Sequence, residues 1–323
     1  MSEAASTKVV MPGRGAWLSW LGHPVEYLAL GEDTGGTYAF SRGTIPAGQG
    51  PPPHRHGFQE GFYVLKGEVT FTAGSRTVTL PRGGYIAIGG GTAHTLRNHG
   101  ADEAEVLTLV GPAGFDRYQR EAGRAVADSS GPFDPPSPEE MARLESLAPG
   151  SGIEFDLPDD AFRVEPDVVV RQPGEGTAIT AVGDLYTFLA VGDETHGRYG
   201  LWDAIIPPGG GPPPHIQTRE HEGFYVLEGE LAFRAEGKRV VAGPGSFINV
   251  PPGVVHAFQN ETDRPARQLI WVAPGGLETM FLETGRVVAD RSAPIPPPSP
   301  DEIERLLAVA PRYGVEVRPP GGP

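Results

Sequence analysis

The feature that most constrains the fold of this chain is an internal repeat. Pro51-Pro-Pro-His54 recurs as Pro212-Pro-Pro-His215, so 161 positions separate the equivalent histidines. One residue is then inserted, and Glu60-Gly-Phe-Tyr-Val-Leu65 recurs 162 positions later as Glu222-Gly-Phe-Tyr-Val-Leu227. A repeat that holds its register with a single insertion indicates a duplicated domain.

The repeat also sets the expected domain boundary. A chain of 323 residues exceeds the size at which a single hydrophobic core usually stops growing. Between the two copies, residues 157–169 are rich in proline and aspartate, which is typical of a polar connector. We therefore predict two domains, residues 1–162 and residues 163–323.

Most of each copy is predicted to be β-structure. Short runs of β-branched and aromatic residues alternate with clusters of glycine and proline, so the 46 glycines and 35 prolines are best explained as turn residues. The clearest strands in the first copy are Gly61–Leu65, Val69–Ala73, Arg76–Leu80 and Tyr85–Ile88. Many short strands separated by turns are typical of a sandwich or a barrel.

Each copy has one predicted helix, near its C-terminal end. Ser137 is a good N-cap, Pro138 suits the first helical position, and two glutamates follow at the positive end of the helix dipole. The same arrangement begins at Ser299 in the second copy. We expect each helix to pack on the outside of the β-structure.

Four residues of the first copy have the chemistry of a metal site. His54 and His56 are two positions apart, so an extended segment places both imidazoles on one face. Glu60 begins the next strand, and His94 must return to the same place on a neighbouring strand. Three imidazoles and one carboxylate suit Fe, Ni, Mn, Co, Cu or Zn. We predict one divalent transition metal per chain.

The spacing of these residues resembles the two sequence motifs of the cupin family. The first motif is matched at every defined position by Gly48-x5-His54-x-His56-x3-Glu60-x6-Gly67. The second is matched by Gly83-x5-Gly89-x-Gly91-x2-His94-x3-Asn98, in which Gly89 stands in place of the usual proline. The resemblance implies an all-β fold of two tandem jelly-roll β-barrels, each with a short C-terminal helix. It also implies that His54, His56, Glu60 and His94 are the metal ligands.

The second copy departs from this pattern at one ligand position. Its corresponding residues are His215, Gln217, Glu222 and His256. An amide oxygen is a weaker ligand than imidazole for these metals, so the second site is predicted to be weak or vestigial. His221 is a candidate replacement, but strand alternation predicts that it points outward.

Other residues receive weaker predictions. By alternation from the ligands, Phe62, Val64 and Leu96 face the interior of the first barrel, either as substrate contacts or as core. Three further histidines lack such neighbours in the sequence and are expected to be ordinary loop residues: His23, His99 and His196.

Within the cupins, the sequence segments around the ligands are similar to those of the quercetinase (flavonol 2,3-dioxygenase) family. Gly-Pro-Pro-Pro-His precedes the ligands and Glu-Gly-Phe-Tyr-Val-Leu-x-Gly-Glu follows in both halves. The resemblance implies a metal-dependent dioxygenase that uses O2 on a hydroxylated aromatic or conjugated ketone, such as a flavonol, polyphenol or polyketide-like compound. Glu60 is then the catalytic proton acceptor as well as a ligand.

Two alternatives remain open. A metal-dependent cupin isomerase, cyclase or decarboxylase would need no O2. Two-barrel oxalate decarboxylases usually keep their ligands in both halves, whereas in this chain Gln217 replaces one ligand of the second half. A non-catalytic small-molecule-binding cupin is disfavoured because all four ligands of the first copy are retained.

Composition excludes several other classes of protein. The 41 acidic residues outnumber the 26 basic ones, and a formal charge of −15 disfavours binding to nucleic acid or to anionic membranes. The chain has no cysteine, so disulfides and thiolate chemistry are excluded. Neither a signal peptide nor a long apolar stretch is evident. We expect a cytoplasmic protein, monomeric or homodimeric, because two fused barrels already mimic a cupin dimer.

Overall fold

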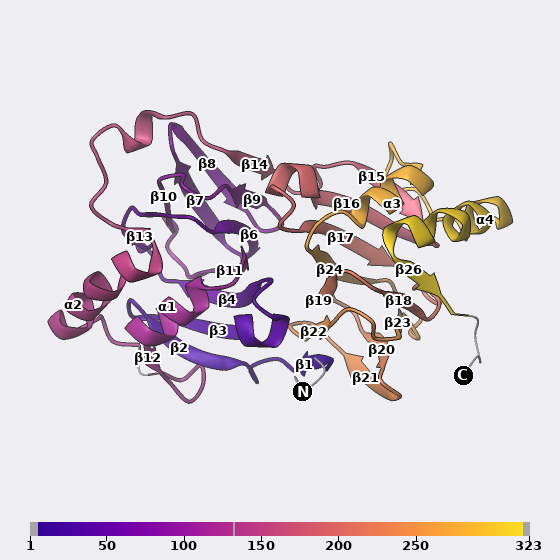
Figure 1. The fold of residues 1–323 in the computed structure, drawn as a ribbon, viewed down its shortest axis with the longest axis horizontal. Coiled ribbons are helices and arrows are strands. Elements are labelled where there is room, and N and C mark those ends of the chain that lie inside the picture. Colours follow the sequence, from indigo (N-terminus) through magenta and orange to yellow (C-terminus); the bar gives the residue numbers. More distant parts are fainter. Residues whose placement is uncertain (1–5, 132, 319–323) are drawn as a thin grey trace. The chain divides into compact units, whose positions relative to one another are not determined.

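The computed structural model describes residues 6–131 and 133–318. The chain forms two compact units (Figure 1). The N-terminal unit is Gly13–Gly174, and the C-terminal unit combines the described residues from Glu175 onward with those up to Pro12. Both consist mainly of antiparallel strands, which confirms the predicted all-β fold class.

The N-terminal unit is built on an eight-stranded sheet with the order β12-β2-β3-β4-β11-β6-β9-β14. Its strands are β2 (Ala16–Trp20), β3 (His23–Ala29), β4 (Ala39–Ile45), β6 (Gln59–Lys66), β9 (Tyr85–Ile88), β11 (Ala104–Gly111), β12 (Arg124–Ala125) and β14 (Val168–Arg171). Two smaller sheets, β10-β7-β8 and β13-β5, complete the unit. Their strands are β5 (Arg55–His56), β7 (Glu68–Ala73), β8 (Arg76–Pro81), β10 (His94–Arg97) and β13 (Ile153–Glu154).

The C-terminal unit repeats this plan with an eight-stranded sheet in the order β1-β22-β19-β24-β17-β16-β15-β25. Its strands are β1 (Lys8–Val10), β15 (Ala178–Ala181), β16 (Asp184–Ala190), β17 (Gly200–Ile206), β19 (His221–Glu228), β22 (Phe247–Val250), β24 (Ala266–Ala273) and β25 (Arg286–Val287). The second sheet has the order β21-β20-β23-β18-β26. It contains β18 (His215–Gln217), β20 (Leu231–Ala235), β21 (Lys238–Ala242), β23 (His256–Gln259) and β26 (Val315–Val317).

The two predicted helices are α2 (Pro138–Leu147) and α4 (Pro300–Val309). Ser137 and Ser299 cap them as expected, and each forms a capping box with a glutamate three residues later. Each unit also contains a helix that the sequence analysis missed, α1 (Phe115–Ala122) and α3 (Glu278–Thr284). Short 3-10 turns occupy Gly31–Thr34, Pro149–Ser151, Ala161–Arg163, Gly192–Thr195 and Ala310–Tyr313.

The division of the chain differs from the expected boundary at 162/163 because the first strand of each copy pairs in the sheet of the other. β14 is the first strand of the second copy, yet it pairs with β9 in the N-terminal unit. β1 is its equivalent at the start of the chain and pairs with β22 in the C-terminal unit. Each exchanged strand covers a sheet edge whose backbone groups would otherwise be unpaired.

The exchanged segment explains why Gly89 departs from the cupin motif. The Gly89 N–H donates a hydrogen bond of 2.8 Å to the carbonyl of Asp167, which proline could not do. A Cβ at this position would also lie 2.1 Å from Oδ2 of Asp167. Glycine is therefore required by the chain segment that crosses here.

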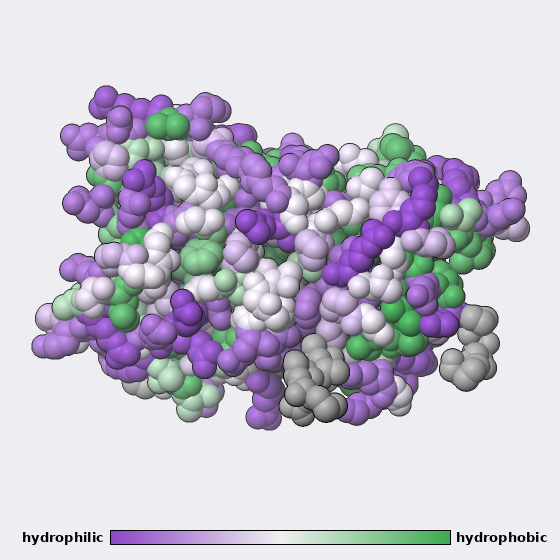
Figure 2. Space-filling view, viewed as in Figure 1, coloured by the Kyte–Doolittle hydropathy of each residue, from purple (hydrophilic) through white to green (hydrophobic). Residues whose placement is uncertain are grey.

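None of the helices in the described part of the chain is long and apolar enough to cross a membrane. The face drawn in Figure 2 is mostly hydrophilic, and its apolar residues form separate patches.

The interior of the C-terminal unit contains a buried acid, Asp184. This residue is fully buried, and the Tyr186 hydroxyl donates to it at 3.4 Å. Burial raises the pKa of Asp184 well above its usual range. A carboxyl group with a raised pKa keeps its proton in the folded state after the unfolded chain has lost it.

Asp184 should therefore make stability fall as the pH rises. Above a pH of about 4 the unfolded residue ionises while the folded one does not, which costs up to about 1.4 kcal/mol per pH unit. We predict that Asp184→Asn loses less unfolding free energy than the wild type between pH 5 and pH 8, measured by urea denaturation. Asp290→Asn, an exposed carboxylate, is the control and should behave as the wild type. Equal pH dependence in all three proteins would contradict the prediction.

Candidate metal centre

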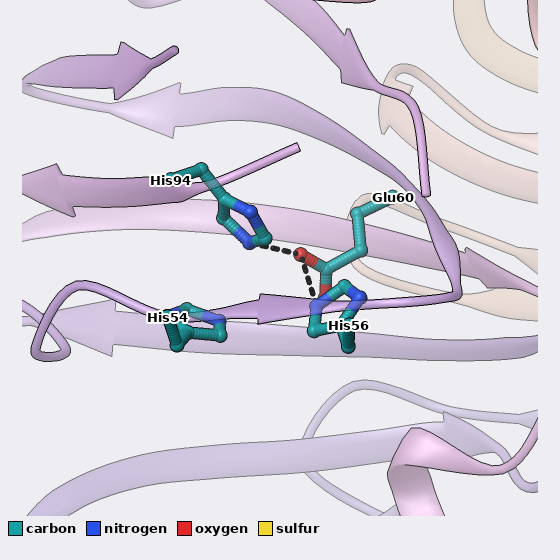
Figure 3. Close-up of side chains that lie close together, drawn as sticks. All are labelled: His54, His56, Glu60 and His94. Carbon is teal, nitrogen blue, oxygen red and sulfur yellow. Dashed lines mark hydrogen bonds and ion pairs between the residues drawn. The ribbon is translucent and has the colours of Figure 1, made fainter. Parts of the chain in front are cut away.

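The four side chains singled out in the first copy lie together inside the N-terminal unit (Figure 3). Each offers a ligand atom, and these atoms all lie within 4.8 Å of one another. His56 ends β5, Glu60 lies on β6 and His94 begins β10. His54 is held in place by a backbone bridge to His94, in which the two N···O distances are 3.0 and 2.8 Å. All four residues are buried.

The carboxylate of Glu60 is the centre of the group. Its Oε2 lies 3.2 Å from Nε2 of His56 and 3.1 Å from Nε2 of His94. Figure 3 shows both imidazoles directed at this oxygen, with the ring of His54 beside them. The ring centroids of His54 and His94 are 4.3 Å apart. The donor atoms therefore converge on one small region.

Backbone carbonyls orient two of the imidazoles. Nδ1 of His54 lies 2.9 Å from the carbonyl of Pro52, and Nδ1 of His94 lies 2.8 Å from that of Thr92. A carbonyl can only accept, so Nδ1 carries the proton in both rings. Nε2 then presents its lone pair to the centre, as in many histidine-ligated metal sites.

The protonation states of Glu60 and His54 suit a cation. Burial, with a contribution from His94, lowers the pKa of His54 to about 3, so this imidazole is neutral near pH 7. Burial would raise the pKa of Glu60, but the charge and hydrogen bond of His56 and the contact with His94 outweigh it, and the pKa lies well below its usual range. Burial alone would lower the pKa of His56, yet Glu60 raises it overall. Glu60 in its charged form and His54 in its neutral form are ready to bind a metal, whereas at His56 the metal has to replace the proton that Glu60 stabilises.

A cavity of about 120 Å³ adjoins the group. His54, Glu60 and His94 are in its wall, and most of the other lining residues are apolar. Phe62 and Leu96 line it, as the alternation predicted. Val64 does not, because it is fully buried in the surrounding core.

Several lining residues were not anticipated. His23 was expected to be an ordinary loop residue, but it begins β3 and lines the cavity, whereas His99 is exposed and His196 ends a 3-10 turn. The period-two pattern of His23, Val25 and Tyr27 was the signal that could have revealed this face. The remaining polar and aromatic contributions come from Trp20, Tyr27, Ser41, Thr44, Thr108, Phe115, Tyr118, Gln119 and Phe155.

The C-terminal unit contains a smaller group at the equivalent place. His215, Glu222 and His256 offer ligand atoms within 4.8 Å of one another. Oε2 of Glu222 lies 2.7 Å from Nε2 of His256 and 3.9 Å from that of His215. Gln217 is buried on β18, and within the described residues its Oε1 has no hydrogen-bond partner. His221 is not part of the group.

The interior beside this second group is filled with aromatic rings. The 161- and 162-residue separations of the internal repeat align Tyr27 with Phe188, Ser41 with Trp202 and Gln119 with Phe281. The ring of Trp202 lies 5.8 Å from the ring of Phe188 and 5.8 Å from that of Phe281. All three belong to, or pack against, the core of the C-terminal unit. The space that forms the cavity in one unit is therefore occupied in the other.

Comparison with known proteins agrees with this duplicated architecture. The family model for the cupin domain matches residues 41–110 and again residues 202–272. The chain carries two cupin domains. Each match includes one of the two His/Glu groups, so both groups occupy the interior of a cupin barrel.

The chain is similar in sequence to a protein of known activity and in fold to solved structures. Quercetin 2,3-dioxygenase of Bacillus subtilis (strain 168) is 25% identical over 281 residues, which cover 80% of this chain and 79% of that protein. Among solved structures, oxalate decarboxylase of Bacillus subtilis has a TM-score of 0.57 at 16% identity, covering 85% of this chain and 79% of the other. Protein Ylba of E. coli has a TM-score of 0.56 at 12% identity, covering 84% and 93%. The structural matches establish the two-cupin fold. The oxalate decarboxylase of Bacillus subtilis has Mn(II) centres.

The missing imidazole in the second cupin domain leads to a prediction about metal content. We expect about one tightly bound divalent metal per wild-type chain, lost in His54→Ala and retained in His215→Ala. In the His54→Ala background, Gln217→His should give the second cupin domain three histidines and a glutamate. The Co(II) affinity of that second site should then rise about tenfold or more. Elemental analysis and titration of Co(II) absorption would measure both effects. Equal loss of metal in His54→Ala and His215→Ala would contradict the predicted asymmetry.

Proposed function

We propose that His54, His56, Glu60 and His94 bind one divalent transition metal, and that the protein is a metal-dependent dioxygenase. The proposed substrate is a hydroxylated aromatic or conjugated ketone, and the ion is Fe, Ni, Mn, Co, Cu or Zn. The observation that carries the proposal is that a buried group of three histidines and one glutamate opens on an apolar cavity. The similarity to a quercetin 2,3-dioxygenase over most of both chains supports it.

The residues around the cavity have distinct roles in this proposal. A bound metal would supply Lewis acidity that lowers the pKa of a substrate hydroxyl. Glu60, held in its charged form, accepts the proton of that hydroxyl. The carbonyls of Pro52 and Thr92 keep two imidazoles oriented while the proton moves. The apolar lining keeps water away from the resulting anion.

The size of the cavity restricts the substrate. An engineered protein cavity of about 150 Å³ holds benzene, so 120 Å³ corresponds to about one ring. This favours a single-ring hydroxyketone over a three-ring flavonol in the conformation described.

The charge of the cavity separates the proposal from a dicarboxylate decarboxylase. Its described lining contains no lysine or arginine. A substrate with a second carboxylate would lose its hydration at that end without gaining a cationic partner. The lining therefore favours a substrate that is neutral away from the metal.

Oxygen consumption tests the reaction class. Metal-loaded protein should consume O2 in proportion to the loss of a single-ring hydroxyketone or polyphenol, measured with an oxygen electrode. Glu60→Gln should lower the rate about 100-fold or more because the proton acceptor is lost. Glu222→Gln is the matched control in the second cupin domain and should keep most of the rate. Turnover that continues unchanged without O2 would instead support an isomerase, cyclase or decarboxylase.

The second cupin domain suggests a test of where the substrate binds. Ser41→Trp introduces the residue that stands at the equivalent position, Trp202, and should fill the cavity. We predict loss of at least 90% of turnover with unchanged metal content, because the tryptophan takes the substrate's space and touches no ligand. Ser41→Ala leaves the cavity open and is the control. Full turnover by Ser41→Trp would place the substrate elsewhere.

A further inference from the structure

Two polar side chains meet in the wall of the N-terminal cavity. Tyr27 lies on β3 and Gln119 on α1, and the tyrosine hydroxyl donates a hydrogen bond to the glutamine side-chain carbonyl. Their exposed fractions are 4% and 7%, and both residues line the cavity. In a largely apolar wall, a buried hydroxyl and a buried amide form a distinct polar site.

The pair retains hydrogen-bonding capacity for a ligand. The amide has two polar atoms, and the tyrosine occupies one of them. The hydroxyl oxygen of Tyr27 can also accept a further hydrogen bond. Burial, together with the charges of Asp116 and Glu60, raises the pKa of Tyr27 well above its usual range, so the hydroxyl keeps its proton. A neutral donor and a neutral amide suit an uncharged oxygen atom.

Sheet register places the pair across the cavity from the carboxylate. Glu60 pairs with Val110, which pairs in turn with Ala39. Ser41, the next inward-facing residue after Ala39, pairs with Tyr27. Tyr27 is therefore one inward-facing level away from Glu60 and three strands further around the barrel wall. A ligand held at Glu60 would have its opposite side near Tyr27.

The second cupin domain shows that the fold does not require this pair. Phe188 and Phe281 stand at the two equivalent positions, and both pack in the filled interior. The helices that carry the second member are equivalent, because Gly123 N–H donates to the carbonyl of Gln119 as Gly285 N–H does to that of Phe281. The polar pair is thus present in the barrel whose interior holds the described cavity, and it is replaced by two phenylalanines in the barrel where aromatic rings pack at the equivalent place.

We propose that Tyr27 and Gln119 bind a second oxygen atom of the substrate, on the side of the ring opposite the metal-bound hydroxyl. This assignment rests on the proposed function for the location and class of the substrate. It restricts the substrate to a single ring that carries a hydroxyketone at one edge and a hydroxyl or carbonyl oxygen at the other.

A pair of pyranone ligands tests the proposal. 5-Hydroxy-2-hydroxymethyl-4-pyranone and 5-hydroxy-2-methyl-4-pyranone share the hydroxyketone edge and differ by one hydroxyl group on the opposite side. Calorimetric titration of the Co(II)-loaded full chain should show that the hydroxymethyl compound binds about tenfold more tightly, the scale of one good hydrogen bond. In Tyr27→Phe and Gln119→Leu this ratio should fall towards one, with unchanged metal content.

Tyr118→Phe is the matched control. Tyr118 lines the same cavity, but its hydroxyl donates to the backbone carbonyl of Leu144 at 3.0 Å, so it is already engaged in joining α1 to α2. This variant should keep the wild-type ratio. An unchanged ratio in both Tyr27→Phe and Gln119→Leu, or no binding of either compound to the wild type, would overturn the assignment. Because turnover is not measured, failure of the dioxygenase proposal would appear separately, as an absence of O2 consumption.

Discussion

A carboxylate buried in an apolar barrel has to be compensated, and in the N-terminal cupin domain that constraint organises everything around it. Leaving such a charge unpaired would cost several kcal/mol, so the residue would otherwise take up a proton. Glu60 remains ionised because imidazoles lie 3.1 and 3.2 Å from one of its oxygens. Those imidazoles need fixed positions in turn, which the strand pairing and the carbonyls behind the rings provide. A divalent cation would complete the compensation.

The two cupin domains differ in how the interior of the barrel is filled. Both keep a glutamate and two histidines at the same place. In the C-terminal domain, the fully buried ring of Trp202 and the partly buried ring of Phe281 fill the interior, and full burial of a large side chain contributes about 2–3 kcal/mol. In the N-terminal domain, Ser41 and Gln119 stand at those positions. The apolar contacts made by the large rings are absent there, and a cavity occupies the space. The C-terminal domain thereby gains apolar burial, while the N-terminal domain keeps the space that the proposed function requires.

The grouping of the four candidate ligands could be predicted from sequence because their spacing is local. His54 and His56 are related by strand alternation alone, and His94 falls at a fixed distance within a long motif. The predicted strands and the capped helices are local features for the same reason. The exchange of β1 and β14 could not be foreseen, because no pattern in either strand says which sheet edge it will cover.

The cavity wall was predicted less completely, because it is assembled from distant parts of the chain. The alternation of side chains along the strand that carries Glu60 predicts that Phe62 lines the cavity. Val64 is on the same face of that strand, but it lies in the packed core and not at the cavity. Gln119 depends on α1, whose signal was present as Phe115, Tyr118 and Ala122 at helical spacing and was overlooked. Its meeting with Tyr27 joins residues 92 positions apart, which only the folded chain reveals.

The charges in the cavity wall constrain the chemistry more than the fold does. Among its described lining residues, Glu60 is the only carboxylate, and lysine and arginine are absent. Any ionised group of a ligand therefore has to lie at the histidine end, where a cation would balance it. The opposite wall, with Tyr27 and Gln119, can satisfy only neutral polar atoms. A molecule that ionises at one edge and remains neutral at the other matches both walls, and a hydroxyketone ring with a distal oxygen has this distribution of charge.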